Sequence, residues 1–196
     1  LVQAHSMHFK FNLDYSEIVN EIYFSEIEIN EYTKKFNLPT SYAVVQPNAK
    51  TTYTPNKQWG LHNYQEVILK CKHIHWIQVG VPGDSLLKGA ENYIGKTSFR
   101  ELAFIIKNAS FVLADEGLLN HIASAFMTKS LVVQSGFTPI EISRYDSSIP
   151  IVSNPQVECA PCWITEKCPK KKKYCTEQIS VNQIIETIKR VECDGY

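Results

Sequence analysis

The chain has 196 residues, 44% of them hydrophobic, which suits one domain with a well-filled core and is too short for two full α/β domains. Lys plus Arg and Asp plus Glu each number 20, so the formal net charge is zero and offers no global attraction for nucleic acid or an anionic membrane. No apolar run approaches the roughly 20 residues that cross a bilayer, and the start does not resemble a signal peptide, so we expect a soluble cytoplasmic protein.

Residues 1–40 differ in character from the rest of the chain. They are rich in Glu, Asn and Tyr, and their alternation of apolar and polar residues around residues 7–11 is weak. We therefore expect an arm with one strand and one helix and little core of its own. Because the chain begins at Leu1 and not at Met, we also expect it to be a fragment of a longer protein.

From Ser41 onward, short apolar runs alternate with amphipathic segments. The apolar runs predict strands at 42–46, 74–79, 111–114 and 131–134. The amphipathic segments predict helices at 60–71, 98–106, 116–125 and 180–191, and Ser98 with Glu101 is spaced as a capping box. This alternation predicts an α/β fold, a Rossmann-like parallel sheet flanked by helices on both faces.

The most informative junction follows the predicted strand 111–114, where Asp115, Glu116 and Gly117 lead directly into a helix. Backbone N–H groups at a helix start lack intrahelical partners, so a phosphate can bind there, and Gly117 lets the backbone approach it. A carboxylate beside a diphosphate would be repelled, so we expect Glu116 to face sugar hydroxyls. The first turn also supplies three further candidates, of which the histidine is equally explained by packing: Leu118, Asn120 and His121.

Other candidates lie in loops that follow predicted strands. Lys57, in the long polar loop 47–60, suits a diphosphate, although a solvated surface lysine has the same pattern. Asp84, in the loop after the strand 74–79, suits a ribose diol or equally its own turn. Thr138, after the strand 131–134, can close the same pocket.

Four cysteines near the end of the chain form a quartet with two, five and six intervening residues: Cys159, Cys162, Cys168 and Cys175. Four thiolates can close a tetrahedral zinc site that pins a loop with few apolar residues. Free thiols, or disulfides in an exported protein, fit the same spacing. Cys71 and Cys193 stand alone, and Lys170 to Lys173 is most simply a solvated run.

Taken in order, these segments carry a resemblance. Residues 41–191 resemble the C-terminal, donor-binding half of the glycosyltransferase family 9 enzymes, the heptosyltransferases of surface-glycan assembly. The matching segments are Lys57 with Trp59, Gly80 with its acidic loop, 95–102, 115–125, and 135–139 followed by the cysteine-rich tail.

The resemblance implies one half of a GT-B fold and inverting sugar transfer with no metal required for the transfer. Lys57 would contact the donor diphosphate, Asp84 the ribose, and residues 116–121 the phosphates and sugar, with Thr97 and Ser98 as further donor-binding candidates. The family's catalytic base is an aspartate of the N-terminal domain, so the catalytic residue of this chain is unknown. Residues 1–40 would be the connector and end of that absent domain, and 41–196 the Rossmann-like nucleotide-sugar-binding domain, with a cysteine-rich loop at 157–176 and a C-terminal helix at 180–191.

The implied function is transfer of a sugar, with heptose from ADP-heptose favoured, to a lipopolysaccharide or other surface-glycan acceptor. The implied partners are a nucleotide diphosphate sugar, a glycan or glycolipid acceptor and the missing N-terminal domain. We expect no nucleic acid, and at most peripheral contact with the inner face of a bacterial inner membrane. Two alternatives stay open: another GT-B nucleotide-sugar enzyme such as an epimerase, and a non-catalytic module that binds zinc and nucleic acid through the quartet and Lys170 to Lys173.

Overall fold

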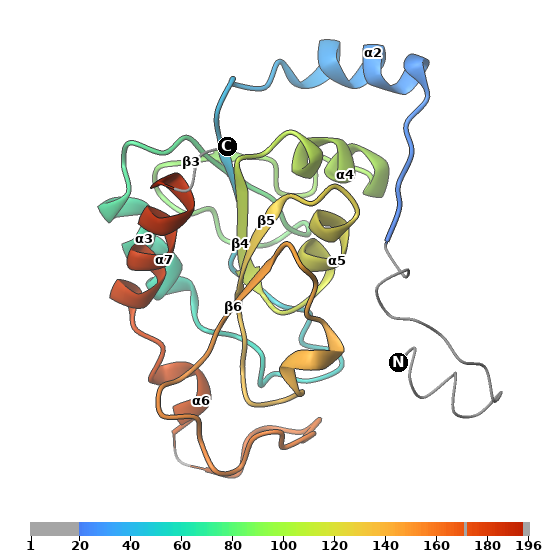
Figure 1. The fold of residues 1–196 in the computed structure, drawn as a ribbon. Helices are drawn as coiled ribbons and strands as arrows, with labels where there is room; N and C mark the ends of the chain where they lie inside the picture. The colour runs from blue at the N-terminus through green and yellow to red at the C-terminus, as the bar shows by residue number, and fades with distance from the viewer. Residues whose placement is uncertain (1–19, 171, 194–196) are drawn as a thin grey trace, which may run out of the picture.

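The computed structural model describes residues 20–170 and 172–193, and the strand expected near residues 7–11 lies outside them. In the described part, six parallel strands form one sheet in the order β3-β2-β1-β4-β5-β6 (Figure 1). The strands are β1 (Ala43–Gln46), β2 (Trp76–Gln78), β3 (Ala90–Asn92), β4 (Phe111–Asp115), β5 (Lys129–Val133) and β6 (Ser148–Ile151). The helices are α2 (Glu26–Phe36), α3 (Leu61–Lys70), α4 (Phe99–Lys107), α5 (Leu118–Ser124), the 3₁₀ helix η2 (Ile140–Ile142), α6 (Tyr174–Glu177) and α7 (Val181–Cys193).

The centre of the sheet lies at β1, which pairs with β2 on one side and β4 on the other. Val44 is in register with both Ile77 and Val112, and all three side chains are fully buried. Strands covered on both faces are apolar throughout, which is why the sequence shows runs here and no alternation. The strand order reverses between β1 and β4, and open α/β sheets bind ligands beyond the carboxyl ends of the strands at such a point.

Helices cover both faces of the sheet, as the sequence predicts. On one face α3 and α7 pack against side chains such as Val45 and Leu113, and on the other α2, α4 and α5 pack against Val44 and Val112. Figure 1 shows α3 and α7 to the left of the strands and α4 and α5 to the right. The Rossmann-like α/β fold is therefore confirmed.

The helix expected in residues 1–40 is α2, and it is joined to α4 by two reciprocal contacts. Ser25 and Glu28 form a capping box at α2, and Ser98 and Glu101 form the predicted capping box at α4. The glutamate of each box also binds a cation of the other helix, because Arg100 contacts Glu28 and Lys35 contacts Glu101. The start of α4 is thus tied to both ends of α2.

The sequence did not predict β3, β6 or α6. In β3, Glu91 and Asn92 are exposed at the edge of the sheet, so the strand has no apolar run. In β6, Pro150 lacks an N–H, and an edge strand tolerates this because one side of its backbone has no partner strand. Edge strands therefore lack the pattern that marks the buried ones.

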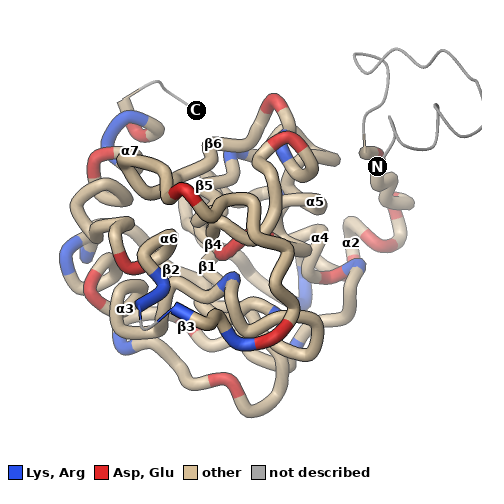
Figure 2. Tube along the Cα trace, turned by 90° about the horizontal axis from the view of Figure 1, so that it is seen from below, with Lys and Arg blue, Asp and Glu red and all other residues tan. Residues whose placement is uncertain are grey.

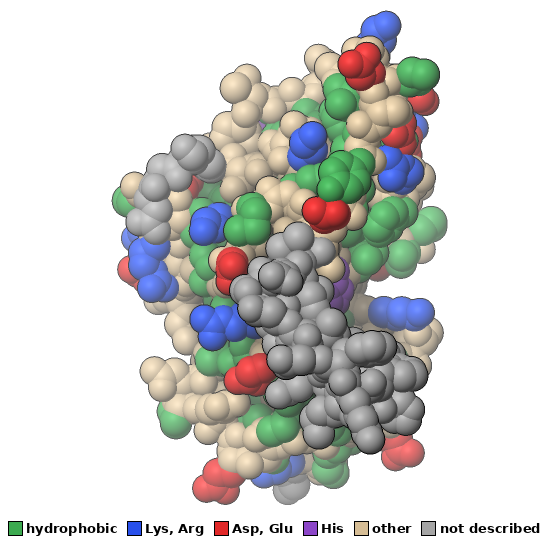
Figure 3. Space-filling view, turned by 45° about the vertical axis from the view of Figure 1, so that its right-hand side comes forward, with side chains coloured by type: hydrophobic (Ala, Val, Ile, Leu, Met, Phe, Trp, Pro, Cys, Tyr) green, Lys and Arg blue, Asp and Glu red, His purple; other side chains and the backbone are tan. Residues whose placement is uncertain are grey.

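Figure 3, turned toward the side of α2, α4 and α5, shows hydrophobic side chains interspersed with charged ones. Among residues 20–170 and 172–193, no helix combines the length and the hydropathy needed to cross a membrane.

Candidate functional site

The candidate site lies at the carboxyl edge of the sheet, where the loops after β1, β4 and β5 meet; Figure 2 looks onto this edge. Lys57, from the loop after β1, forms an ion pair with Glu116, which directly follows β4. The Lys57 ammonium also lies 5.4 Å from the ring centroid of Phe137, from the loop after β5. The two charged side chains are only 18% and 8% exposed, so the interpretation of Lys57 as a solvated surface lysine is wrong.

The last residue of β4 provides a second buried acid. Asp115 Oδ1 accepts hydrogen bonds from the Trp59 backbone N–H at 3.2 Å and the Tyr64 hydroxyl at 2.7 Å. Asp115 Oδ2 has no hydrogen-bond partner within the described residues. Burial raises the pKa of this carboxyl to about 8, and the hydrogen bonds from Tyr64 and Trp59 act in the opposite direction. Asp115 thus ties the end of β4 to the start of α3, directly beside Glu116.

The start of α5 is open. Gly117 is its N-cap residue and has an extended backbone, and a Cβ placed there would meet only the Asp115 carbonyl oxygen, at 3.9 Å. Leu118, the first helical residue, is half exposed. The predicted strand-to-helix junction is confirmed, and, its two chain neighbours aside, no described side chain lies within 4 Å of a Cβ placed on Gly117.

Two predicted residues of α5 have partners within the protein. Asn120 is buried, donates to the Ser143 carbonyl oxygen at 2.6 Å and accepts from the Ser148 hydroxyl at 2.7 Å, so it secures the segment that leads into β6. His121 is exposed, and its Nδ1 lies 2.7 Å from the Tyr145 hydroxyl. His121 and Leu118 line a shallow pocket on the flank of α5.

Three of the remaining predicted residues form hydrogen bonds with partners other than Lys57 and Glu116. Asp84 accepts from the Val81 N–H and the Asn48 amide, both at 2.9 Å, which is the turn-stabilising role left open for it. Ser98, next to Thr97, caps α4. Thr138 Oγ1 lies 3.3 Å from Gln134 Nε2 in the loop after β5. Their roles toward a donor stay predictions.

Comparison with known proteins decides the family. The family model described as glycosyltransferase family 9 (heptosyltransferase) matches residues 2–173. The chain belongs to glycosyltransferase family 9. No curated protein matches it.

Solved structures show the same fold at low identity. A glycosyl transferase family 9 protein from Veillonella parvula matches with a TM-score of 0.71 and 14% identity, over 97% of this chain and 59% of that one. The ADP-heptose LPS heptosyltransferase II of E. coli matches with a TM-score of 0.69 and 13% identity, over 91% and 55%. The iron-containing dodecameric glycosyltransferase TibC of enterotoxigenic E. coli matches with a TM-score of 0.64 and 19% identity, over 79% and 47%, and a further TibC structure contains ADP-D-β-D-heptose. This family 9 chain therefore spans about half to three fifths of the length of these proteins.

The cysteine quartet of this family 9 chain lies at the same edge of the sheet. All four thiols line one small pocket with Asn56, Phe137 and Lys173. Burial raises the pKa of the Cys175 thiol, and no disulfide joins any of the four in the structure. Across residues 20–170 and 172–193, nowhere do three or more His, Cys, Asp or Glu side chains converge as a metal site, so the structural zinc stays a prediction from the spacing.

Sequence reasoning missed three residues of the site. Phe137 and Tyr64 are aromatic side chains, and nothing in the sequence shows that they contact Lys57 and Asp115. Asn56 pairs with backbone groups 108 to 112 residues further along the chain, a separation at which no local pattern gives a signal. The sequence indicated that this segment belongs to the site through the long polar loop 47–60 and Lys57, but it did not single out Asn56.

Proposed function

We propose that this chain is the donor-binding half of an inverting family 9 glycosyltransferase. Its donor would be a nucleotide diphosphate sugar, with ADP-heptose favoured, and its acceptor a lipopolysaccharide or other surface glycan. The proposed location is the cytoplasm, at the inner face of the membrane, where a glycolipid acceptor would be reached. The other half of the cleft and the catalytic base would come from an N-terminal domain.

The observation that carries the proposal is the Lys57–Glu116 pair at the point where the strand order reverses. A cation and an acid face each other beside the start of α5. The Lys57 ammonium would bind the negatively charged diphosphate, and the Glu116 carboxylate would accept a hydrogen bond from a sugar hydroxyl. The nucleotide sugar is supported by two structural relatives, one named for ADP-heptose and one determined with ADP-D-β-D-heptose.

The chemistry assigned to this half concerns the leaving group. In the proposed reaction an acceptor hydroxyl oxygen forms a bond to the anomeric carbon while the bond from that carbon to the diphosphate oxygen breaks. The hydroxyl proton passes to the base outside this chain, and negative charge develops on the diphosphate. The Lys57 ammonium would stabilise that charge, and Glu116 would accept a hydrogen bond from the sugar.

Calorimetric titration with ADP tests the proposal. Charge-assisted contacts typically contribute about 1.5 to 3 kcal/mol, so Lys57→Met should weaken ADP binding roughly ten-fold to a hundred-fold. Lys50→Met, which removes an exposed lysine of the same loop, is the matched control and should leave affinity unchanged. Equal ADP affinities for the wild type, Lys57→Met and Lys50→Met would refute the assignment of Lys57. Heptose transfer catalysed by this chain alone would refute the placement of the catalytic base in another domain.

We also propose that the quartet of cysteines closes on one structural zinc ion that stabilises the tail and takes no part in sugar transfer. The thiols would have to approach one another more closely than in the structure. Metal analysis of protein purified under reducing conditions should find close to one metal per chain, with Cys168→Ser losing it and Cys193→Ser keeping it. Iron is measured in the same samples, because the relative TibC is described as iron-containing. A content far below one metal per chain contradicts the proposal.

A further inference from the structure

Asn56, directly before Lys57, uses its whole amide group on a distant segment. The side chain is buried, and its Nδ2 donates to the carbonyl oxygens of Ile164 at 2.7 Å and Glu166 at 2.6 Å. Its Oδ1 accepts from the Cys168 N–H at 3.0 Å. An amide has two donor hydrogens and an acceptor oxygen, and here both kinds of group are engaged by the cysteine-rich loop 157–176.

The residues just before Asn56 also form hydrogen bonds with the cysteine-rich loop. Thr54 is buried, donates to the Ile164 carbonyl oxygen at 3.1 Å and accepts from the Asn56 N–H at 3.2 Å. Lys173, at the far end of the cysteine-rich loop, lies with its ammonium 3.4 Å from the Pro55 carbonyl oxygen. Three consecutive residues, 54–56, are therefore fixed to that loop immediately before the chain reaches Lys57.

The cysteine-rich loop is also bound to the segment that follows β5. Cys162 and Trp163 donate their backbone N–H groups to the carbonyl oxygens of Gly136 and Phe137, at 2.9 and 3.0 Å. A Cβ on Gly136 would lie 3.1 Å from Cys175 Cβ, so the loop sits closely against the segment that follows β5. The cysteine-rich loop thus joins the end of β5 to the segment that carries Lys57.

We propose that Asn56 is a positioning residue, which holds Lys57 opposite Glu116 by anchoring residues 54–56 to the cysteine-rich loop. The expected effect of Asn56 on nucleotide affinity rests on the proposed function. Its expected effect on the position of Lys57 does not depend on that function. The cysteine-rich loop then acts in donor binding without touching the donor, and the affinity for a nucleoside diphosphate depends on how that loop is folded.

The first measurement is independent of any nucleotide. Lysine acetylation followed by mass spectrometry reports the exposure of Lys57, with the well-exposed Lys189 of α7 as internal reference. Asn56→Ala removes the donor to the Glu166 carbonyl oxygen and one of the two donors to the Ile164 carbonyl oxygen, so Lys57 labelling relative to Lys189 should rise about five-fold or more. Asn108→Ala, which removes an amide donating to a helix carbonyl elsewhere, should leave that ratio unchanged.

The second measurement is a double-mutant cycle on ADP affinity. Asn56→Ala should weaken binding about ten-fold when Lys57 is present and less than about two-fold in a Lys57→Met background, because its effect acts through Lys57. If Asn56→Ala does not fold, Thr54→Val removes the two hydrogen bonds of the Thr54 hydroxyl while keeping the Asn56 amide, and should shift both readouts in the same direction by a smaller factor.

An unchanged labelling ratio overturns the inference, and so does an equal loss of ADP affinity in both backgrounds. A wild-type chain that binds no ADP while Asn56→Ala still exposes Lys57 would refute the proposed function and leave Asn56 as the residue that positions Lys57. The two proposals therefore fail in different ways.

Discussion

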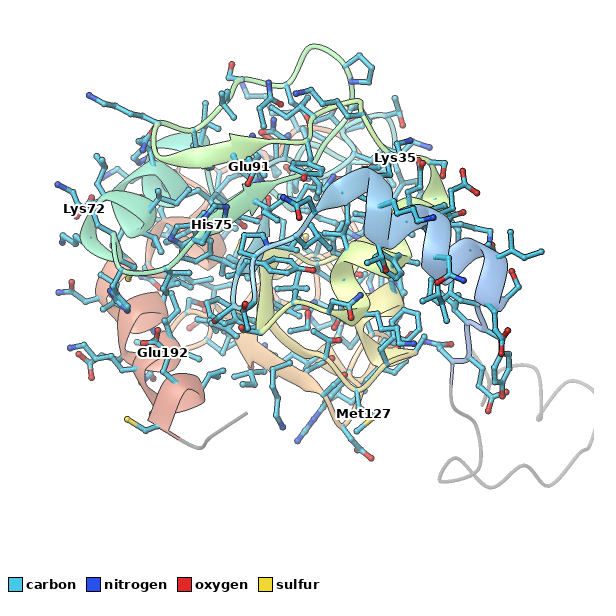
Figure 4. All side chains as sticks on the ribbon, turned by 90° about the horizontal axis from the view of Figure 1, so that it is seen from above. Lys35, Lys72, His75, Glu91, Met127 and Glu192 are labelled. Atoms are coloured by element: carbon cyan, nitrogen blue, oxygen red, sulfur yellow. The ribbon has the colours of Figure 1, made fainter. Side chains whose placement is uncertain are left out.

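Charged side chains at the two edges of the sheet have opposite environments. At the amino edge, seen from above in Figure 4, His75 and Glu91 meet at 2.7 Å with both side chains 45% exposed, and His73 meets Glu192 at 3.1 Å. At the carboxyl edge, Lys57, Glu116 and Asp115 are largely removed from water. Solvent-exposed pairs cost little to form and contribute little to stability, whereas buried ones carry a desolvation cost that packing must offset. Ionisable groups held at that cost are a feature of functional sites, which is why we assign the carboxyl edge to ligand binding.

Of the substitutions that compare the two edges of the sheet, Lys57→Met should change the free energy of unfolding most. It leaves the Glu116 carboxylate buried without its cation, so the free energy of unfolding should fall by about 3 kcal/mol. The double variant Lys57→Met/Glu116→Gln removes both charges and should recover most of that loss. Urea unfolding of the two variants beside Lys35→Met, whose pair with Glu101 is more exposed, provides the comparison. Equal losses for Lys57→Met and Lys35→Met would show that burial does not distinguish the two pairs.

An effect of comparable size is expected from Asp115→Asn, and it depends on pH. The raised pKa means that the folded chain retains a proton that the unfolded chain releases near pH 4. The resulting stability is full below pH 4 and is lost as pH rises through about 8, so the wild type should lose about 2 to 4 kcal/mol between pH 5 and pH 9.

Asparagine resembles the protonated acid and keeps the oxygen that accepts from Trp59 and Tyr64, so Asp115→Asn should remove this slope. Asp146→Asn, at an exposed position, is the control and should keep the wild-type profile. Denaturant melts across the pH range make the measurement, and parallel profiles for Asp115→Asn and wild type would contradict the assignment.

The smallest effect belongs to the amino edge. Glu91→Gln removes the charge that His75 contacts, and because both groups are half exposed the free energy of unfolding should change by less than about 0.5 kcal/mol. High salt should reduce this difference in the free energy of unfolding further, because it screens charges that are exposed to solvent. A loss comparable to that of Lys57→Met would remove the contrast between the edges.

The buried central strands were predictable from sequence, and the two outermost strands of the sheet, β3 and β6, were not. Runs such as Phe111 to Ala114 signal a strand because burial on both faces demands apolar residues throughout, and the Ser98–Glu101 box signals α4 because its contacts are local. In β3 and β6 neither condition holds. Membership of family 9 and the Rossmann-like sheet are confirmed, while the donor contacts of the individual residues stay predictions.

At the site, the sequence identified positions but not partners. Lys57 and Glu116 were each recognisable as polar residues that follow a strand, and the parallel sheet brings their loops together. Three features depend on tertiary contacts between residues that are more than 20 positions apart. These are the pairing of Lys57 with Glu116, the structural role of Asn120, and the binding of Asn56 to the cysteine-rich loop. Local patterns cannot encode such contacts.

The reciprocal contacts between α2 and α4 make the opening of two helices a single event. Glu28 and Glu101 each accept from a backbone N–H at the start of their own helix and bind a cation of the other helix. Fraying of the first turn of α2 therefore releases Arg100 of α4, and fraying of the first turn of α4 releases Lys35 in the last turn of α2. Backbone amides at the start of α4 and at both ends of α2 should therefore exchange with solvent at a common rate. An arm that precedes the sheet in the chain is in this way incorporated into the cooperative unit of the domain.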